Sequence, residues 1–130
     1  MAYEAVDRHI AAGQGTDVAI RFLAKTDAPD AAGVVYTYER LARETSAFAR
    51  ALDRLGVTPG ESVFLLAGRV PRLYVSVLGA LRGRYLVCPL FSAFGPEPIR
   101  ERVARAEGSV IVTTPKLLPK VNEIRAQLPS

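Results

Sequence analysis

Apolar and polar positions along the second half of the chain predict strands and helices in turn. Residues 63–66 form a short, unbroken apolar run, which is typical of a strand that is buried on both faces. Pro71 can open a helix, because the first helical position needs no N–H donor. The apolar positions that follow at helical spacing are Leu73, Tyr74, Val77, Leu78 and Leu81. Gly79 and Ala80 are small enough to let this helix lie close to a sheet. With the next apolar run at 85–88, the stretch predicts a βαβ unit whose strands are parallel.

The first 36 residues predict a short helix and a β-hairpin. Residues 3–12 are a helical candidate. Residues 18–23 alternate loosely like a strand, and residues 34–36 can pair back on them across a turn-rich connection at 25–33.

A long amphipathic helix is predicted between Thr37 and Gly56. Thr37 is a suitable N-cap, with Glu39 in the first turn, where the helix dipole favours a negative charge. Gly56 is a suitable C-cap, because glycine adopts the left-handed conformation without a side-chain clash. The residues predicted on the inner face are Leu41, Thr45, Phe48, Leu52 and Leu55.

After the central unit, the pattern predicts a helix, a strand and a final helix. Pro98 is predicted to start the first of these helices, and the final helix begins at or near Pro119, which cannot lie inside a helix. The predicted inward residues are Ile99, Val103 and Ala106 in the first helix and Val121, Ile124 and Leu128 in the last.

Strand–helix alternation over this half of the chain predicts an α/β fold of the three-layer type. Parallel strands at 62–67, 85–88 and 109–113 would carry helices on both faces of the sheet, with the N-terminal β-hairpin at one side. The chain is expected to form a single α/β domain over residues 1–130. Within it, residues 1–36 form the N-terminal helix and hairpin, and residues 37–130 form the alternating core.

Composition narrows the classes of function. The 130 residues carry a formal net charge of +4, and their arginines are scattered over predicted helix faces and loops, which disfavours a nucleic-acid partner. Cys88 is the only cysteine, so we expect no internal disulfide and no cysteine-based zinc site. Arg82 and Arg84 interrupt the longest apolar stretch, so no membrane span is predicted. No secretory signal is visible, and a cytoplasmic location is expected.

The motifs that usually mark an active site are missing from these residues. The sequence has no glycine-rich phosphate loop, no dinucleotide fingerprint, no Gly-x-Ser-x-Gly elbow and no metal-ligating cluster. His9, the only histidine, is predicted to be a surface or structural residue. The residues by themselves therefore predict no catalytic residue and no metal ligand.

The best candidate for a binding loop follows the strand at 85–88. Ligands of open α/β sheets bind at the carboxyl ends of the strands. Phe91 and Phe94 offer flat faces on which an adenine can stack, and Ser92 and Ala93 let a ligand approach the backbone. Alternatively, both rings simply fill the core between the sheet and the next helix.

Two lysines lie beyond the third predicted strand, at the same edge of the sheet if the strands are parallel. Lys116 and Lys120 could receive the phosphates of a ligand, although lysines at helix starts are more often only solvated.

Several short motifs occur in an order that is specific when taken together. They are YTYERL at 36–41, LGV at 55–57, PGESV at 59–63, RVPRLY at 69–74, LGAL at 78–81, PLFSAF at 89–94 and VTT at 112–114. This order resembles the amino-terminal part of acyl-CoA synthetases of the adenylate-forming superfamily, and is most similar to bacterial acetyl-CoA synthetases. The likeness runs from about Tyr3 to Val121.

The resemblance implies an ATP-dependent acid–thiol ligase as the parent protein. Such enzymes use ATP and Mg²⁺ to convert a small carboxylate into an acyl-adenylate, and coenzyme A then takes the acyl group. Their phosphate loop, their acidic ribose contact and their late catalytic lysine have no counterpart here. The chain is therefore expected to be an N-terminal fragment that is inactive alone, binds none of these cofactors tightly, and has the rest of the parent polypeptide as its partner.

The resemblance also implies a coenzyme A site. The segment that matches Phe91, Ser92 and Ala93 lies against the nucleotide end of coenzyme A in acetyl-CoA synthetases, many of which have two glycines in place of Ser92 and Ala93. A basic stretch that matches residues 115–120 contacts the coenzyme A phosphates. This chain lacks the arginines of that stretch, so Lys116 and Lys120 are the candidate substitutes. Residues 83–85 also depart from the family, which usually has a small apolar step there.

Two other classes of function are open. The chain could be a non-catalytic α/β binding or interaction module that has the shape of a synthetase without its chemistry. It could also belong to an adenylation domain that loads a carrier protein instead of coenzyme A. If the chain is a severed fragment, it would expose apolar surface that the missing part should cover, so we expect self-association.

Overall fold

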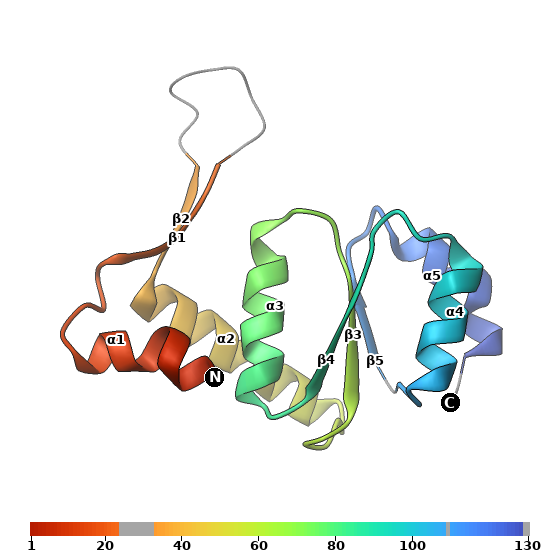
Figure 1. Cartoon of the computed structure of the whole chain (residues 1–130), viewed down its shortest axis with the longest axis horizontal. Helices are drawn as coiled ribbons and strands as arrows, with labels where there is room; N and C mark the ends of the chain where they lie inside the picture. Colours follow the sequence, from red (N-terminus) through yellow and green to blue (C-terminus); the bar gives the residue numbers. More distant parts are fainter. Residues whose placement is uncertain (24–32, 109, 129–130) are drawn as a thin grey trace.

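A computed structural model describes residues 1–23, 33–108 and 110–128 of the chain (Figure 1). Its helical segments are a π-helix at Tyr3–Asp7, α1 (Arg8–Ala11), α2 (Tyr38–Arg54), α3 (Pro71–Arg82), α4 (Pro96–Arg105), α5 (Leu118–Ile124) and a 3-10 turn at Arg125–Gln127. Its strands are β1 (Val18–Phe22), β2 (Val34–Thr37), β3 (Ser62–Leu66), β4 (Leu86–Leu90) and β5 (Val110–Thr113). Most of the turn predicted at 25–33, and the first residue of the strand predicted at 109–113, lie outside the described residues.

The predicted parallel sheet is confirmed. Its strand order is β4-β3-β5, and β3 pairs in parallel with both neighbours. β4 runs over 86–90 and not over the predicted 85–88, because the N–H of Tyr85 donates to the carbonyl of Ala80 (3.0 Å) and closes the end of α3. The chain runs from β3 through α3 to β4, and then from β4 through α4 to β5, which lies on the other side of β3. Right-handed crossovers consequently place α3 and α4 on opposite faces of the sheet.

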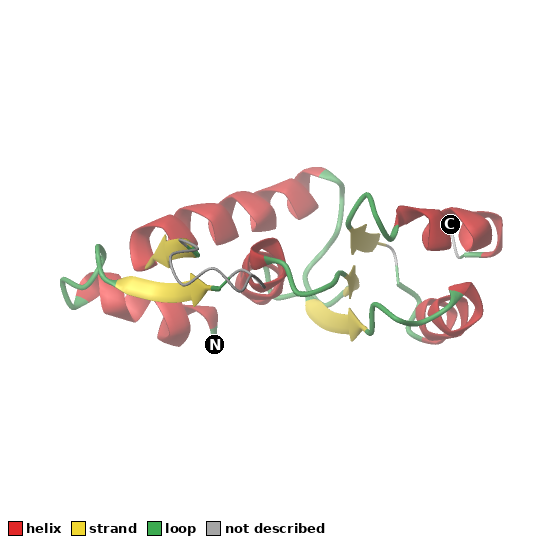
Figure 2. Cartoon of the chain, turned by 90° about the horizontal axis from the view of Figure 1, so that it is seen from above, coloured by secondary structure: helices red, strands yellow, loops and turns green. Residues whose placement is uncertain are grey.

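Two helical layers therefore cover the sheet, as the three-layer prediction requires. Seen from above, the strands lie between α2 and α3 on one side and α4 and α5 on the other (Figure 2). Val63 and Leu65 of β3 pack with the α2 and α3 side chains, whereas Phe64 and Leu66 pack with those of α4 and α5. The unbroken apolar run of β3 is explained by this burial on both faces.

Helix α2 begins at the predicted cap but ends one residue before the predicted end, so its inner face is shorter. Thr37 accepts a hydrogen bond from the N–H of Arg40 (3.2 Å), and Gly56 has a φ of 84°. Leu55 is 72% exposed, so its predicted place on the inner face is wrong. The helix ends one residue earlier, and the turn at Gly56 brings Val57 into the core in its place.

The packing of α3 differs from the predicted stripe of large residues. Tyr74, predicted on the apolar face, is 42% exposed, whereas Val75, Ser76, Gly79 and Ala80 are buried. Ala80 packs with the sheet cluster as predicted. The close approach at Gly79, however, is to α2: a Cβ atom there would lie 2.8 Å from Phe48 Cδ1. Small residues matter here because two helices lie side by side on the same face.

Helix α4 starts earlier than predicted and does not bury its last predicted residue. Pro96, and not Pro98, occupies its first position, and both prolines fall in the first turn, where N–H donors are not needed. Ile99 and Val103 are buried, but Ala106 is exposed. The chain leaves the helix after residue 105. For α5, the predicted start near Pro119 is confirmed.

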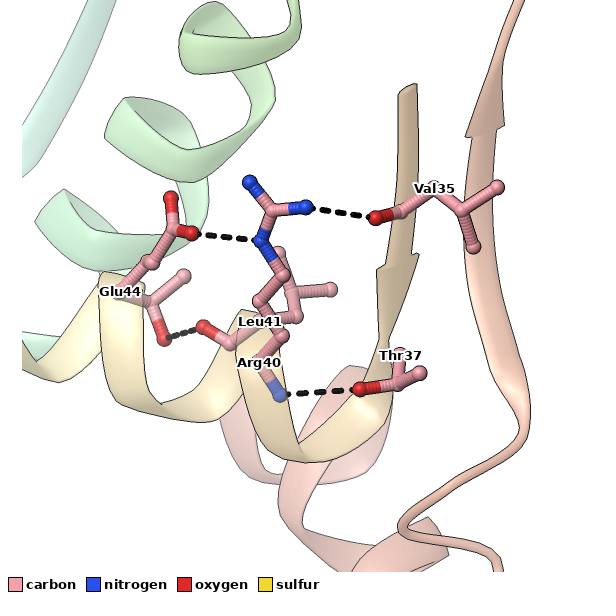
Figure 3. Close-up of polar contacts among 6 residues, drawn as sticks. Val35, Thr37, Arg40, Leu41 and Glu44 are labelled. Atoms are coloured by element: carbon pink, nitrogen blue, oxygen red, sulfur yellow. Dashed lines mark hydrogen bonds and ion pairs between the residues drawn. The ribbon is translucent and has the colours of Figure 1, made fainter. Parts of the chain in front are cut away.

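The predicted antiparallel hairpin is confirmed as a separate two-stranded sheet of β1 and β2. It lies with α1 at the end of the molecule opposite α4 and α5 (Figure 1). Arg40 joins it to α2, as Figure 3 shows: its guanidinium donates to the carbonyl of Val35 (2.8 Å) and to Glu44 Oε1 (2.8 Å). The guanidinium also lies 4.1 Å from the ring centroid of Tyr36, so one side chain fixes the hairpin on the helix.

Arg82 joins three separate helical segments. Its Nη2 donates to Asp7 Oδ1 (2.9 Å), and its Nε donates to Thr45 Oγ1 (3.2 Å). Thr45 is fully buried, and its own hydroxyl donates to the carbonyl of Leu41 (2.7 Å). The network ties the N-terminal helical turns to the contact between α2 and α3.

We predict that Gly79→Ala destabilises the chain. The new methyl group would also lie 2.9 Å from the carbonyl oxygen of Thr45, so the two helices must move apart. Overpacking lowers the free energy of unfolding by about 1–3 kcal/mol. The higher helix propensity of alanine offsets about 1 kcal/mol of this loss. A net loss of about 1 kcal/mol in the free energy of unfolding should appear in urea denaturation. Gly68→Ala is the matched control, because nothing lies within 4 Å of its Cβ position. Equal stabilities of the two variants would contradict the close approach.

We also predict energetic coupling between Arg82 and Asp7. Their side chains are only 23% and 28% exposed, so a double-mutant cycle with Arg82→Met and Asp7→Asn should give a coupling of about 1 kcal/mol. The same cycle on Glu4 and Arg8, both 61% exposed, should give almost none. Similar coupling in both pairs would show that Arg82 is no more than a surface partner.

Candidate functional site

The loop at 91–95 follows the carboxyl end of β4, and its two phenylalanines differ in exposure. Phe91 is 64% exposed, whereas Phe94 is half-buried against the cluster of α4 and α5. Their ring centroids are 5.7 Å apart at an interplanar angle of 85°, an edge-to-face contact. Phe94 therefore fills the core, while Phe91 keeps a face open to a ligand.

The structure brings Lys120, but not Lys116, to this loop. Lys120 Nζ donates to the carbonyl oxygens of Ser92 (3.0 Å) and Phe94 (2.8 Å). Ser92 is half-buried and Ala93 is exposed. Lys116 is exposed in the turn after β5, and within the described part of the chain no hydrogen bond links it to the loop. Of the five residues expected at the coenzyme A site, Ser92 and Lys120 are in direct contact.

One charged side chain of α4, Arg102, lies against the loop. The guanidinium of Arg102 lies 4.3 Å from the ring centroid of Phe94 and donates to the carbonyl of Pro98 (2.9 Å). The sequence gives no signal for this contact, because Arg102 falls on the outer face of the helix pattern. Glu97 accepts hydrogen bonds from Arg100, which lowers the pKa of the Glu97 carboxyl. The first turn of α4 therefore carries an ion pair between Glu97 and Arg100.

The structure also has a hollow away from this loop. An open groove of about 830 Å³ runs between the hairpin, α2, α3 and the ends of β3 and β5. Phe48, Leu65, Val75 and Val112 are among its apolar lining residues. The sequence pattern offers no signal for this groove, because it arises where separate elements meet. It is distinct from the 91–95 loop and shares no lining residue with it.

His9 has structural partners, as expected. Its ring stacks on Tyr38 at a centroid distance of 4.4 Å, and its Nδ1 lies 3.1 Å from Gln14 Oε1. Over residues 1–23, 33–108 and 110–128, no three His, Cys, Asp or Glu side chains are grouped so that they could hold a metal ion. Among the same residues, every helix is too short or too polar to cross a membrane.

Comparison with known proteins identifies relatives over nearly the whole chain. The family described as "AMP-binding enzyme" matches residues 8–130. The acetyl-coenzyme A synthetase of Bacillus subtilis is 35% identical over 122 residues, which are 92% of this chain and 20% of that protein. The acetyl-coenzyme A synthetase of Syntrophus aciditrophicus is 33% identical over 113 residues, which are 87% of this chain and 17% of that protein.

A solved structure agrees with these relatives in fold. The acyl-CoA synthetase of Brucella canis superimposes with a TM-score of 0.85 and 28% sequence identity, covering 98% of this chain and 22% of that one. The chain thus spans about a fifth of the length of the proteins that it matches. The match over residues 8–130, the sequence identities and the superposition together show that this chain belongs to the AMP-binding enzyme family of adenylate-forming enzymes.

Proposed function

We propose that this chain is the amino-terminal part of an ATP-dependent acetyl-CoA or other short-chain acyl-CoA synthetase. The observation that carries the proposal is the 35% identity to an acetyl-coenzyme A synthetase over 92% of the chain. In the proposed reaction of the parent protein, a small carboxylate attacks the α-phosphate of ATP and displaces pyrophosphate, which gives an acyl-adenylate. The thiol of coenzyme A then takes the acyl group and AMP is released. ATP, Mg²⁺ and coenzyme A are the cofactors of that parent.

The proposed role of these residues is to form a scaffold for the chemistry. β4 and β5 are the two edges of the parallel sheet, and the apolar groove opens beside β5. An apolar groove next to an unpaired strand edge is suited to packing against further polypeptide. We infer that the rest of the parent protein packs there and supplies the catalytic groups, so the 130-residue chain is inactive by itself.

The 91–95 loop supports a coenzyme A site in the proposed enzyme. The exposed ring of Phe91 offers a stacking face for the adenine, and Ala93 is exposed beside it. Lys116 is exposed and carries a positive charge that can pair with a phosphate of coenzyme A. These residues would bind the nucleotide end of coenzyme A at the carboxyl edge of the sheet, where ligands of such sheets bind.

The proposal predicts no turnover by the isolated chain. When the chain is incubated with ATP, Mg²⁺ and acetate, pyrophosphate should stay at the level of a blank without protein. The complete polypeptide encoded by the natural reading frame should release pyrophosphate under the same conditions with acetate or another small carboxylate. Turnover by the isolated chain would refute the scaffold role. A folded complete polypeptide that forms no acyl-adenylate with any small carboxylate would refute the proposed reaction.

The coenzyme A site predicts weak binding that depends on Phe91. Base–aromatic stacking contributes about 1–3 kcal/mol, so Phe91→Ala should weaken the binding of coenzyme A about fivefold or more. Nuclear magnetic resonance titration of the isolated chain can measure this weak affinity. Leu86→Ala is the matched control, because Leu86 is 58% exposed at the opposite end of β4. Equal affinities of the two variants for coenzyme A would show that Phe91 does not contribute to the site.

A further inference from the structure

Lys120 connects two parts of the chain that are far apart in sequence. It lies in the first turn of α5, and its ammonium group reaches the loop that follows β4, 26 and 28 residues earlier. The loop and the start of α5 lie side by side at the top of Figure 1. Lys120 is half-buried, so the contact is not made by a freely moving surface side chain.

The ammonium group uses its donors on the backbone of the loop. An ammonium group has three N–H donors and no acceptor, and two of its donors reach the carbonyls of Ser92 and Phe94. Hydrogen bonds from a charged donor are shorter and stronger than those between neutral groups. Within the loop, the N–H of Phe94 donates to the carbonyl of Phe91 (3.0 Å) and closes a turn. Lys120 therefore holds this turn from outside, through the carbonyls that the turn itself does not use.

The conformation of this turn determines where the exposed ring of Phe91 lies. Phe91 contacts the ring of Phe94 edge to face, and Arg102 lies over the same Phe94 ring. The carbonyl of Phe94 is one of the two that Lys120 holds. A continuous set of contacts thus runs from Lys120 through Phe94 to Phe91.

The geometry points to Lys120 as a positioning residue that presents Phe91 to the nucleotide of coenzyme A. It acts through the loop backbone and does not pair with a phosphate, a role left to the exposed Lys116. This inference rests on the proposed coenzyme A site. It differs from the expectation for the family pattern, in which the basic residues of this stretch contact phosphates.

Two variants of the chain distinguish a lysine that holds the loop backbone from a lysine that pairs with a phosphate. Lys120→Met keeps an unbranched side chain that is one heavy atom shorter, and it removes the donors and the charge. Lys116→Met is the matched control, because it removes an exposed lysine four residues away. Amide hydrogen exchange at Phe94 reports on the turn, and exchange in β3 reports on whether the variant is folded. If Lys120→Met proves unfolded, Lys120→Gln, which keeps a neutral donor, takes its place.

We expect Lys120→Met to speed exchange at the Phe94 amide about tenfold, as the loss of a charge-assisted hydrogen bond would. The affinity of this variant for coenzyme A should fall about threefold or more. Its affinity for 3′-dephospho-coenzyme A should fall equally, and neither loss should depend on salt. Lys116→Met should leave the exchange unchanged.

Several results would overturn the inference. Unchanged exchange at Phe94 in Lys120→Met would show that Lys120 does not hold the turn, whether or not the chain binds a nucleotide. Faster exchange with unchanged affinity would show that the turn does not position Phe91. A loss that salt reduces would show direct pairing with a phosphate. That phosphate is the 3′-phosphate if the loss is absent for the dephospho form, and the pyrophosphate if both nucleotides are affected. If the unmodified chain binds neither nucleotide, the coenzyme A site of the proposed function fails instead.

Discussion

The burial of β3 on both faces is the constraint on which the rest of the structure depends. Val63, Phe64, Leu65 and Leu66 are each no more than 2% exposed. Their side chains alternate between two helical layers, so both layers must form before the strand is shielded from water. Because both neighbouring strands are parallel to β3, each must be reached by a crossover helix. The central strand thereby requires the whole αβ alternation around it.

The same topology creates the place where a ligand can bind. The chain leaves β3 towards α3 on one face of the sheet and leaves β4 towards α4 on the other. Loops that diverge in this way leave an opening at the carboxyl edge of a sheet. The loop after β4 is held there by contacts with α4 and α5, through Arg102 and Lys120. The candidate site is therefore a surface loop that side chains of α4 and α5 hold in place.

The core and the polar contacts of the described residues connect elements of the fold to one another. The described residues build one sheet, its helices and a hairpin that Arg40 fixes to α2. Their polar networks, at Arg40 and Arg82, join elements of the scaffold to one another. The groove beside β5 and the two edge strands of the parallel sheet are the surfaces to which the proposed function assigns further polypeptide.

The sequence by itself determined the elements, because each one depends on local chemistry. The apolar run of β3, the cap at Thr37 and the turn at Gly56 need only their neighbours in the chain, and parallel strands place the 91–95 loop at the carboxyl edge. Only the tertiary structure decided which side chains meet. Leu55 is exposed because the helix ends just before it, and the close contact at Gly79 needs α2 beside α3. Lys120 finds its acceptors 26 and 28 residues away, a distance over which no periodicity carries information.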